Sequence, residues 1–135
     1  MDSQSHYFDE EPKSLSETST VDLTLPDLTA TLVTDRGVFS SGRIDPGTKY
    51  LLQSAPTPEG TVETALDLGC GYGPIARTLV HRFPKAKIWA TDVNSRARLL
   101  TEKNVGGLGV NVEHPDNIDE NIRFDLICAS NQITL

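Results

Sequence analysis

The stretch that decides the fold is residues 66–74, which read Leu66-Asp67-Leu68-Gly69-Cys70-Gly71-Tyr72-Gly73-Pro74. It completes the short apolar segment 64–68, which is typical of a buried strand, and Pro74 is typical of the first position of a helix. Glycines between a strand and a helix allow backbone torsions and close approaches that a Cβ would block. The stretch therefore predicts a strand, a loop whose main-chain N–H groups can line a ligand pocket, and a helix.

Strands and helices continue to alternate after this loop. Apolar spacing predicts a helix from Pro74 that ends at Pro84, and Ser95 is a candidate cap for a second helix that ends at Gly106-Gly107. Such alternation is typical of a parallel sheet with crossover helices. The predicted strands of this α/β fold are residues 64–68, 87–93, 110–113 and 124–129.

The N-terminal part of the chain has a different sequence pattern. Residues 1–20 are acidic, polar and rich in Ser and Thr, so we expect a mobile tail. Alternating apolar residues on either side of Pro26-Asp27 predict a β-hairpin, and Asp45-Pro46-Gly47 precedes a short helical run. We expect a hairpin and short helix over 21–60, followed by a Rossmann-like half domain over 61–135.

Charge and composition limit the class of protein. Hydrophobic residues make up 37% of the 135 residues, and no apolar run approaches the roughly 20 residues of a membrane helix, so we expect a cytoplasmic globular protein and no membrane partner. Of the net charge of −7, the first 30 residues carry −6, because they hold seven acidic residues and one lysine. A later basic stretch is either an RNA-facing patch or a set of solvated helix faces: Arg77, Arg82, Lys85, Lys87, Arg96, Arg98 and Lys103.

Two carboxylates flank the glycines. Asp67 lies two residues before Gly69, where it would repel the pyrophosphate of a dinucleotide but would suit a ligand with an ammonium group. Asp92 follows an apolar run 19 residues beyond Gly73, where a carboxylate can bind both hydroxyls of a ribose. The alternative role for Asp92 is to cap a helix. The alternative role for the glycines is only to allow tight packing between strand and helix. A nicotinamide-dependent oxidoreductase is a minor alternative, because Asp67 disfavours it.

Residues 67–74 and the acid that follows resemble the class I S-adenosylmethionine-dependent methyltransferases. Thr34-Asp35-Arg36-Gly37-Val38-Phe39-Ser40, with His6-Tyr7-Phe8 and Asp45-Pro46-Gly47-Thr48, resembles the small-domain group that includes ribosomal RNA guanine-N2 methyltransferases of the small subunit. The resemblance implies a Rossmann-like fold, S-adenosylmethionine as cofactor, and ribosomal RNA or the small ribosomal subunit as substrate.

Carried over residue by residue, the resemblance also implies the site. Asp67, Gly69, Gly71 and Gly73 would hold the methionine part of the cofactor, and Asp92 the ribose. Asp116 and Asn117 would flank the adenine, although such a pair is also common in a simple turn. Asn131 would be the catalytic residue, with its side-chain carbonyl accepting a hydrogen bond from the target amine.

The chain departs from the family after the last predicted strand. The family has Asn-Pro-Pro where this sequence has Asn131-Gln132-Ile133, and its fold has seven strands where this sequence supplies four of the Rossmann-like core. We therefore expect a C-terminally truncated core, and a catalytically inactive S-adenosylmethionine-binding remnant is the alternative function. An exposed edge at 124–129 would then favour self-association. No motif for a metal site is present, and Cys70 and Cys128 are expected to be reduced.

Overall fold

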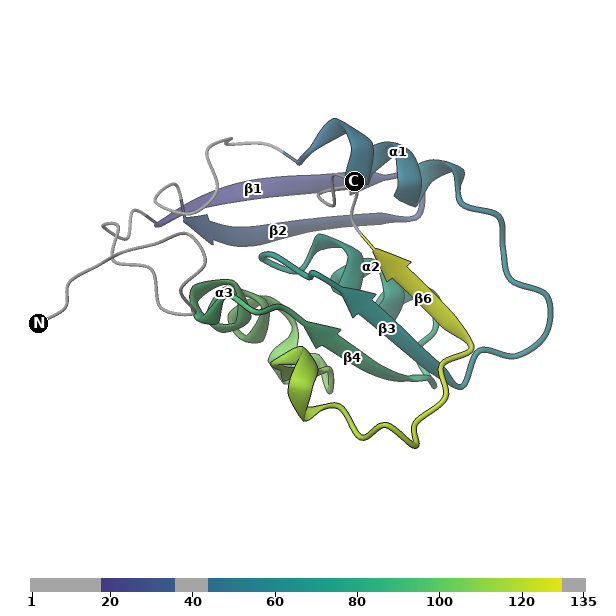
Figure 1. The fold of residues 1–135 in the computed structure, drawn as a ribbon. Coiled ribbons are helices and arrows are strands. Elements are labelled where there is room, and N and C mark those ends of the chain that lie inside the picture. Colours follow the sequence, from purple (N-terminus) through teal and green to yellow (C-terminus); the bar gives the residue numbers. More distant parts are fainter. Residues whose placement is uncertain (1–17, 36–43, 130–135) are drawn as a thin grey trace, which may run out of the picture.

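The computed structural model describes residues 18–35 and 44–129, which form an α/β fold with two sheets (Figure 1). The larger sheet has four parallel strands in the order β5-β4-β3-β6, and the smaller is an antiparallel hairpin. This confirms the predicted parallel sheet. The strands of the larger sheet are β3 (Thr64–Leu68), β4 (Lys87–Thr91), β5 (Asn111–Glu113) and β6 (Leu126–Ala129).

Two helices connect these strands and lie against the same face of the sheet. Helix α2 (Pro74–Arg82) begins at a proline, whose fixed φ suits the first turn, and ends just before Pro84. Helix α3 (Ser95–Val105) is followed by the 3-10 turn η1 (Gly106–Leu108). The cap of α3 is Asn94, whose side chain accepts a hydrogen bond from Ala97 N–H, so the prediction of Ser95 as the cap was wrong by one residue.

The hairpin consists of β1 (Thr18–Leu25) and β2 (Leu28–Asp35), joined at Pro26-Asp27 as predicted. Strand β1 begins three residues before the hairpin predicted from residue 21, so residues 18–20 belong to a strand, and the rest of the predicted tail lies outside the described residues. Helix α1 (Pro46–Ser54) follows, capped by the Asp45 carboxylate on Thr48 N–H.

The hydrophobic core lies between the helices, the hairpin and one face of the sheet. Hairpin residues such as Leu23 and Leu32 belong to the same buried cluster as Ala65 and Ile88 of the sheet and Leu79 of α2. Successive side chains of a strand point to opposite faces, so the apolar residues of the hairpin lie on one face. The hairpin packs through this face onto the sheet and its helices.

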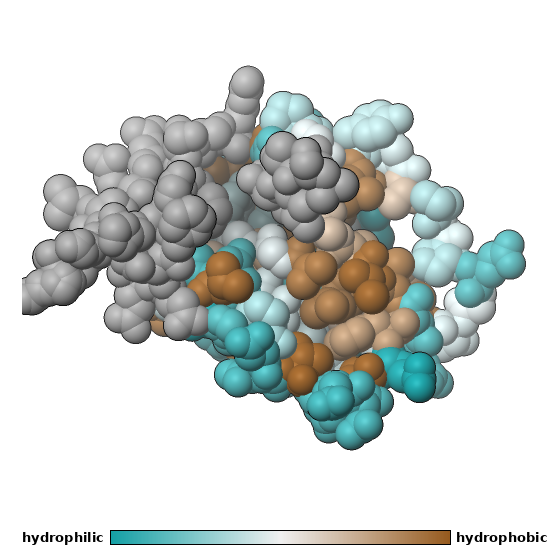
Figure 2. Space-filling model, in the orientation of Figure 1, coloured by the Kyte–Doolittle hydropathy of each residue, from teal (hydrophilic) through white to brown (hydrophobic). Residues whose placement is uncertain are grey.

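The opposite face of the sheet is apolar and open in the described residues. The register aligns Leu66 with Trp89 on β4 and with Ile127 on β6, so the three side chains share one face. Ile127 is 57% exposed, and Figure 2 shows apolar side chains gathered on this side of the molecule. β6 is an outer strand of the described sheet, and self-association through it stays a prediction.

The strands of the larger sheet end close to the predicted residues, and their exact ends determine where the following loops begin. β4 ends at Thr91 rather than at residue 93, because the Asp92 carboxylate accepts a hydrogen bond from Asn94 N–H and turns the chain out of the sheet. The longest helix in the described ranges, α3, has 11 residues, and no helix there has the length and apolar character needed to cross a bilayer.

Candidate functional site

The glycine loop, residues 69–73, leaves the carboxyl end of β3 and enters α2. Gly69, Gly71 and Gly73 all have positive φ, at 74°, 60° and 100°, a region that other L-residues rarely adopt. A Cβ at Gly73 would also lie 3.4 Å from the side chain of Thr101 on α3. All three positions therefore favour glycine because of their backbone torsions, and Gly73 also because of its close approach to α3.

The end of β4 holds the start of this loop. The carbonyl of Thr91 accepts hydrogen bonds from both Gly69 N–H and Cys70 N–H, each at 2.8 Å. Because β3 and β4 are parallel neighbours, their carboxyl ends meet at one edge of the sheet. In open α/β sheets ligands bind in the crevice at that edge, so the loop lies where a ligand site is expected.

Asp67 is fully buried in β3, beneath the loop. Its Oδ2 accepts a hydrogen bond from Ala76 N–H at 3.0 Å, so it supplies the acceptor that Gly73, the N-cap of α2, lacks. Its Oδ1 has no hydrogen-bond partner within the described residues. Burial raises the pKa of Asp67 to about 7, with the Ala76 hydrogen bond opposing the shift and the charge of Asp92 adding to it. A buried, half-bonded carboxylate is costly, so a cationic or hydrogen-donating ligand would stabilise it.

Asp92 lies directly after β4 and bridges two loops. Its Oδ2 accepts a hydrogen bond from Gly71 N–H at 3.0 Å, and its Oδ1 accepts one from Asn94 N–H at 2.9 Å. Because Asn94 caps α3, Asp92 does not have the capping role that was the alternative for it. A carboxylate offers about four acceptor positions, so Asp92 retains capacity for a ligand's hydroxyl groups.

The structure adds Arg98 and Val93, to which sequence reasoning gave no role at the site. Arg98 donates from Nη1 to the carbonyls of Asp92 and Val93, at 2.9 and 3.1 Å, and so holds the turn after β4. Val93 is 55% exposed and presents an apolar surface next to the Asp92 carboxylate. An apolar residue directly after an acidic strand end was the signal for Val93. Nothing in the spacing distinguished Arg98 from a solvated arginine.

Asp116 and Asn117 lie in the 3-10 turn η2 (Pro115–Asn117), which follows β5. Both side chains are exposed, and the hydrogen bonds of the turn are local, with His114 Nδ1 accepting from Asp116 N–H at 3.1 Å. β5 is next to β4, so the turn is at the same edge of the sheet as Asp92. Asn131 and the predicted motif residues 6–8 and 36–40 lie outside the described residues.

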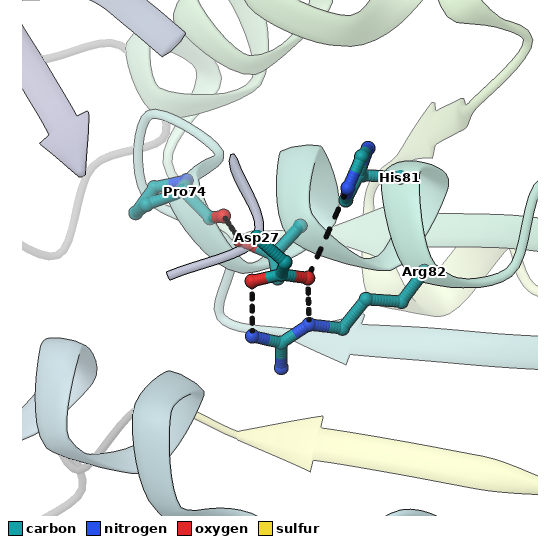
Figure 3. Close-up of polar contacts among 5 residues, drawn as sticks. Asp27, Pro74, His81 and Arg82 are labelled. Carbon is teal, nitrogen blue, oxygen red and sulfur yellow. Dashed lines mark hydrogen bonds and ion pairs between the residues drawn. The ribbon is translucent and has the colours of Figure 1, made fainter. Parts of the chain in front are cut away.

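Within the described part of the chain, contacts with other residues are seen for three members of the basic stretch. Arg82 forms two hydrogen bonds with the Asp27 carboxylate, at 3.0 and 3.1 Å, as Figure 3 shows. Arg96 lies 3.9 Å from the buried Asp35 carboxylate, and Arg98 holds the turn after β4. These contacts favour a structural role for the three arginines over the RNA-facing patch.

Comparison with known proteins agrees with this geometry. Residues 29–131 match the methyltransferase small domain family. The chain is 39% identical over 106 residues to the uncharacterized protein YbxB of Bacillus subtilis (strain 168), covering 78% of this chain and 52% of that protein. It is 43% identical over 94 residues to the ribosomal RNA small subunit methyltransferase C of Hahella chejuensis, covering 68% of this chain and 27% of that protein.

A solved structure shows the same fold. The T. thermophilus 16S rRNA methyltransferase in complex with AdoMet and guanosine superposes with a TM-score of 0.70 at 23% identity, over 92% of this chain and 34% of that one. The chain thus spans between about a quarter and a half of the length of the relatives that it matches. With the family match covering most of the sequence and the glycine loop in place on a parallel sheet, the chain belongs to the methyltransferase small domain family.

Proposed function

We propose that this chain binds S-adenosylmethionine at the carboxyl ends of β3 and β4 and forms part of an enzyme that methylates small-subunit ribosomal RNA. The observation that carries the proposal is Oδ1 of the fully buried Asp67 beside the glycine loop, which has no hydrogen-bond partner among residues 18–35 and 44–129. An orphaned acceptor of this kind calls for a donor from a ligand, and the amino group of S-adenosylmethionine is a charged donor.

Different residues of the site would bind different parts of the cofactor. Asp67 and the glycine loop would hold the methionine part, and Asp92 would accept hydrogen bonds from the ribose while keeping Gly71 N–H in place. Val93 offers an apolar surface for the base, and Asp116 and Asn117 would bind its polar edge. The bound cofactor supplies a methyl group activated by its sulfonium sulfur, so the protein's task is placement and electrostatics.

A dinucleotide fits this site less well. Its pyrophosphate would lie at the N-terminus of α2, which Asp67 already occupies with a carboxylate bonded to Ala76 N–H. Adding two negative charges beside a buried carboxylate would be repulsive. Measured binding of NAD that is tighter than binding of S-adenosylhomocysteine would contradict the proposal.

The relatives suggest the substrate. The Hahella protein is named as a small-subunit ribosomal RNA methyltransferase, and the T. thermophilus enzyme acts on N2 of a guanosine in 16S rRNA. By the same chemistry we propose a guanine exocyclic amine as the acceptor here. Asn131, which follows β6 in the sequence, would accept a hydrogen bond from that amine and direct its lone pair toward the methyl group. With such a substrate, we propose a cytoplasmic location for the protein.

A second candidate function is cofactor binding without turnover. The sequence Asn131-Gln132-Ile133 favours it, because the family's two prolines are missing next to the proposed catalytic residue. Misplacement of a reacting group by about 1 Å can cost on the order of a hundredfold in rate. This candidate shares the cofactor site with the first and differs only at the acceptor side.

Two measurements separate these functions. Isothermal titration calorimetry with S-adenosylhomocysteine tests the cofactor site, and transfer of a labelled methyl group from S-adenosylmethionine to small ribosomal subunits tests the reaction. Binding with transfer supports the enzyme, and binding without transfer supports the second candidate. Absence of binding contradicts both.

A further inference from the structure

Asn104, near the end of α3, joins three segments that are far apart in the sequence. Its Oδ1 accepts a hydrogen bond from Val33 N–H at 2.8 Å, and its Nδ2 donates to the carbonyls of Val33 and Tyr72, at 2.9 and 2.7 Å. These three bonds use the acceptor and both donors of the amide. One half-buried side chain therefore links β2, α3 and the glycine loop.

The contact with Val33 resembles a strand pairing. Val33 pairs with Thr20 in the hairpin register, and in an antiparallel pair every second residue directs its N–H and C=O away from its partner. Val33 offers both of these outward groups to Asn104, so the side-chain amide takes the place of a neighbouring strand at this point of β2. The hairpin is thereby fixed in register against α3.

The contact with Tyr72 fixes part of the glycine loop. The carbonyl of Tyr72 shares a planar peptide unit with the N–H of Gly73, so holding one orients the other. Thr101, three residues earlier on the same side of α3, donates from Oγ1 to the carbonyl of Gly71 at 2.8 Å. Two consecutive peptide units of the loop are therefore oriented by side chains of α3.

We propose that Asn104 is a positioning residue of the cofactor site, which sets the path of the glycine loop and links it to the position of β2. The inference rests on the proposed function, since it assigns Asn104 to the loop that would hold the cofactor. Asn104 acts through the backbone of residues 72 and 73. Its loss would remove this hydrogen bond from the Tyr72 carbonyl and loosen the loop even when no ligand is present.

A second tether of the hairpin provides a matched control. At the hairpin turn, Asp27 binds Arg82 through two hydrogen bonds and lies 3.9 Å from His81, both on the last turn of α2 (Figure 3). This tether also docks the hairpin, but it is at the opposite end of α2 from the glycine loop. Arg82→Gln therefore weakens docking of the hairpin without touching the loop.

The experiment compares Asn104→Ala, Asn104→Asp and Arg82→Gln with the unaltered chain. Asn104→Asp keeps the size of the side chain and the acceptor for Val33 N–H but removes both donors. Amide hydrogen exchange without ligand is measured for residues 69–73 and referred to the amides of β3, which corrects for a change in overall stability. We expect both Asn104 variants to raise loop exchange about tenfold and to weaken S-adenosylhomocysteine binding about tenfold, and Arg82→Gln to change neither by more than about twofold.

Two results would overturn the inference. One is loop exchange at the original rate in both Asn104 variants, and the other is an equal increase in Arg82→Gln, which would assign the effect to hairpin docking in general. Because exchange is read without ligand, a chain that binds no S-adenosylhomocysteine would contradict the proposed function while leaving this test intact.

Discussion

The loop after β3 and the turn after β5 lie at the same edge of the sheet but are built in different ways. Residues 69–73 are held by groups distant in sequence, from the Thr91 carbonyl to the side chains of Asp92 and Thr101. Residues 115–117 are held by their neighbours, with Asn117 N–H bonded to the His114 carbonyl at 2.9 Å. The first loop is preorganised by the whole fold, so changes around it should propagate to the site, and changes in the second should remain local.

The largest expected effect on binding comes from Asp92→Ala. The variant removes the acceptor for both Gly71 N–H and Asn94 N–H, as well as the proposed contact with the ribose. Charge-assisted hydrogen bonds of this kind are worth about 1.5–3 kcal/mol each, so we expect the affinity for S-adenosylhomocysteine to fall by about a hundredfold or more. Calorimetry measures the change.

Asp119→Ala is the matched control, because Asp119 also accepts a hydrogen bond from the N–H two residues ahead but lies in the exposed segment after η2. A loss of affinity in Asp119→Ala as large as in Asp92→Ala would mean that the loop after β3 has no special role.

Gly73→Val should have its main effect on stability. The substitution forces a β-branched residue to φ of 100° and brings its side chain against Thr101. Strain of this type costs about 1–3 kcal/mol, and overpacking adds to it. We expect chemical denaturation to show a lower free energy of unfolding by about 2 kcal/mol or more. Gly107→Val is the comparison, since a Cβ there meets nothing within 4 Å and φ is not positive. Equal losses would contradict the role assigned to Gly73.

The pH dependence of ligand affinity should further distinguish the loop after β3, which has the buried Asp67 beneath it, from the turn after β5. The pKa of Asp67 is raised from 3.8 to about 7. Because the folded chain holds this proton more tightly than the unfolded chain, the contribution of Asp67 to stability is full below about pH 4 and is lost as the pH rises to about 7. A cationic ligand prefers the ionised form, so affinity should rise by up to about tenfold per pH unit below pH 7 and then level off.

Asp67→Asn tests this dependence. The variant keeps an acceptor for Ala76 N–H but cannot ionise, so its affinity should be lower at pH 8 and nearly constant between pH 5 and pH 8. Calorimetry at several pH values provides the comparison. An unaltered pH profile in the variant would show that another group is responsible.

The smallest effect should come from the turn after β5. Asp116→Ala and Asn117→Ala remove exposed side chains from a locally bonded turn, and each should change the affinity for S-adenosylhomocysteine by less than about threefold. The same calorimetric titration applies. A loss approaching that of Asp92→Ala would show that this turn contributes to the site as strongly as the glycine loop.

Much of the fold could be predicted from local patterns. Strand β3 begins and ends at the predicted residues, and the hairpin turn and the start of α2 were correct, because alternation and proline act within a few residues. The cap of α3 was misplaced because Asn94 and Ser95 are both good caps, and only the geometry selects one of them.

The candidate site was less accessible to sequence reasoning. Glycines and carboxylates stand out by type, so Asp67 and Asp92 could be singled out. The residues that hold the loop, Thr101 and Asn104, are ordinary helix residues about 30 positions away from it, and Asn104 also reaches Val33, 71 positions away. Contacts of this range leave no periodic trace in one sequence.

The open face of the sheet gives this protein a built-in optical probe. Trp89 is the only tryptophan of the chain, half-buried on that face, with its ring edge-on to Phe124 at 5.5 Å between centroids. Anything that settles over Leu66 and Ile127 would take water away from the indole, and its fluorescence would shift to shorter wavelength. Emission from one residue therefore reports whether this surface is covered, with no label added.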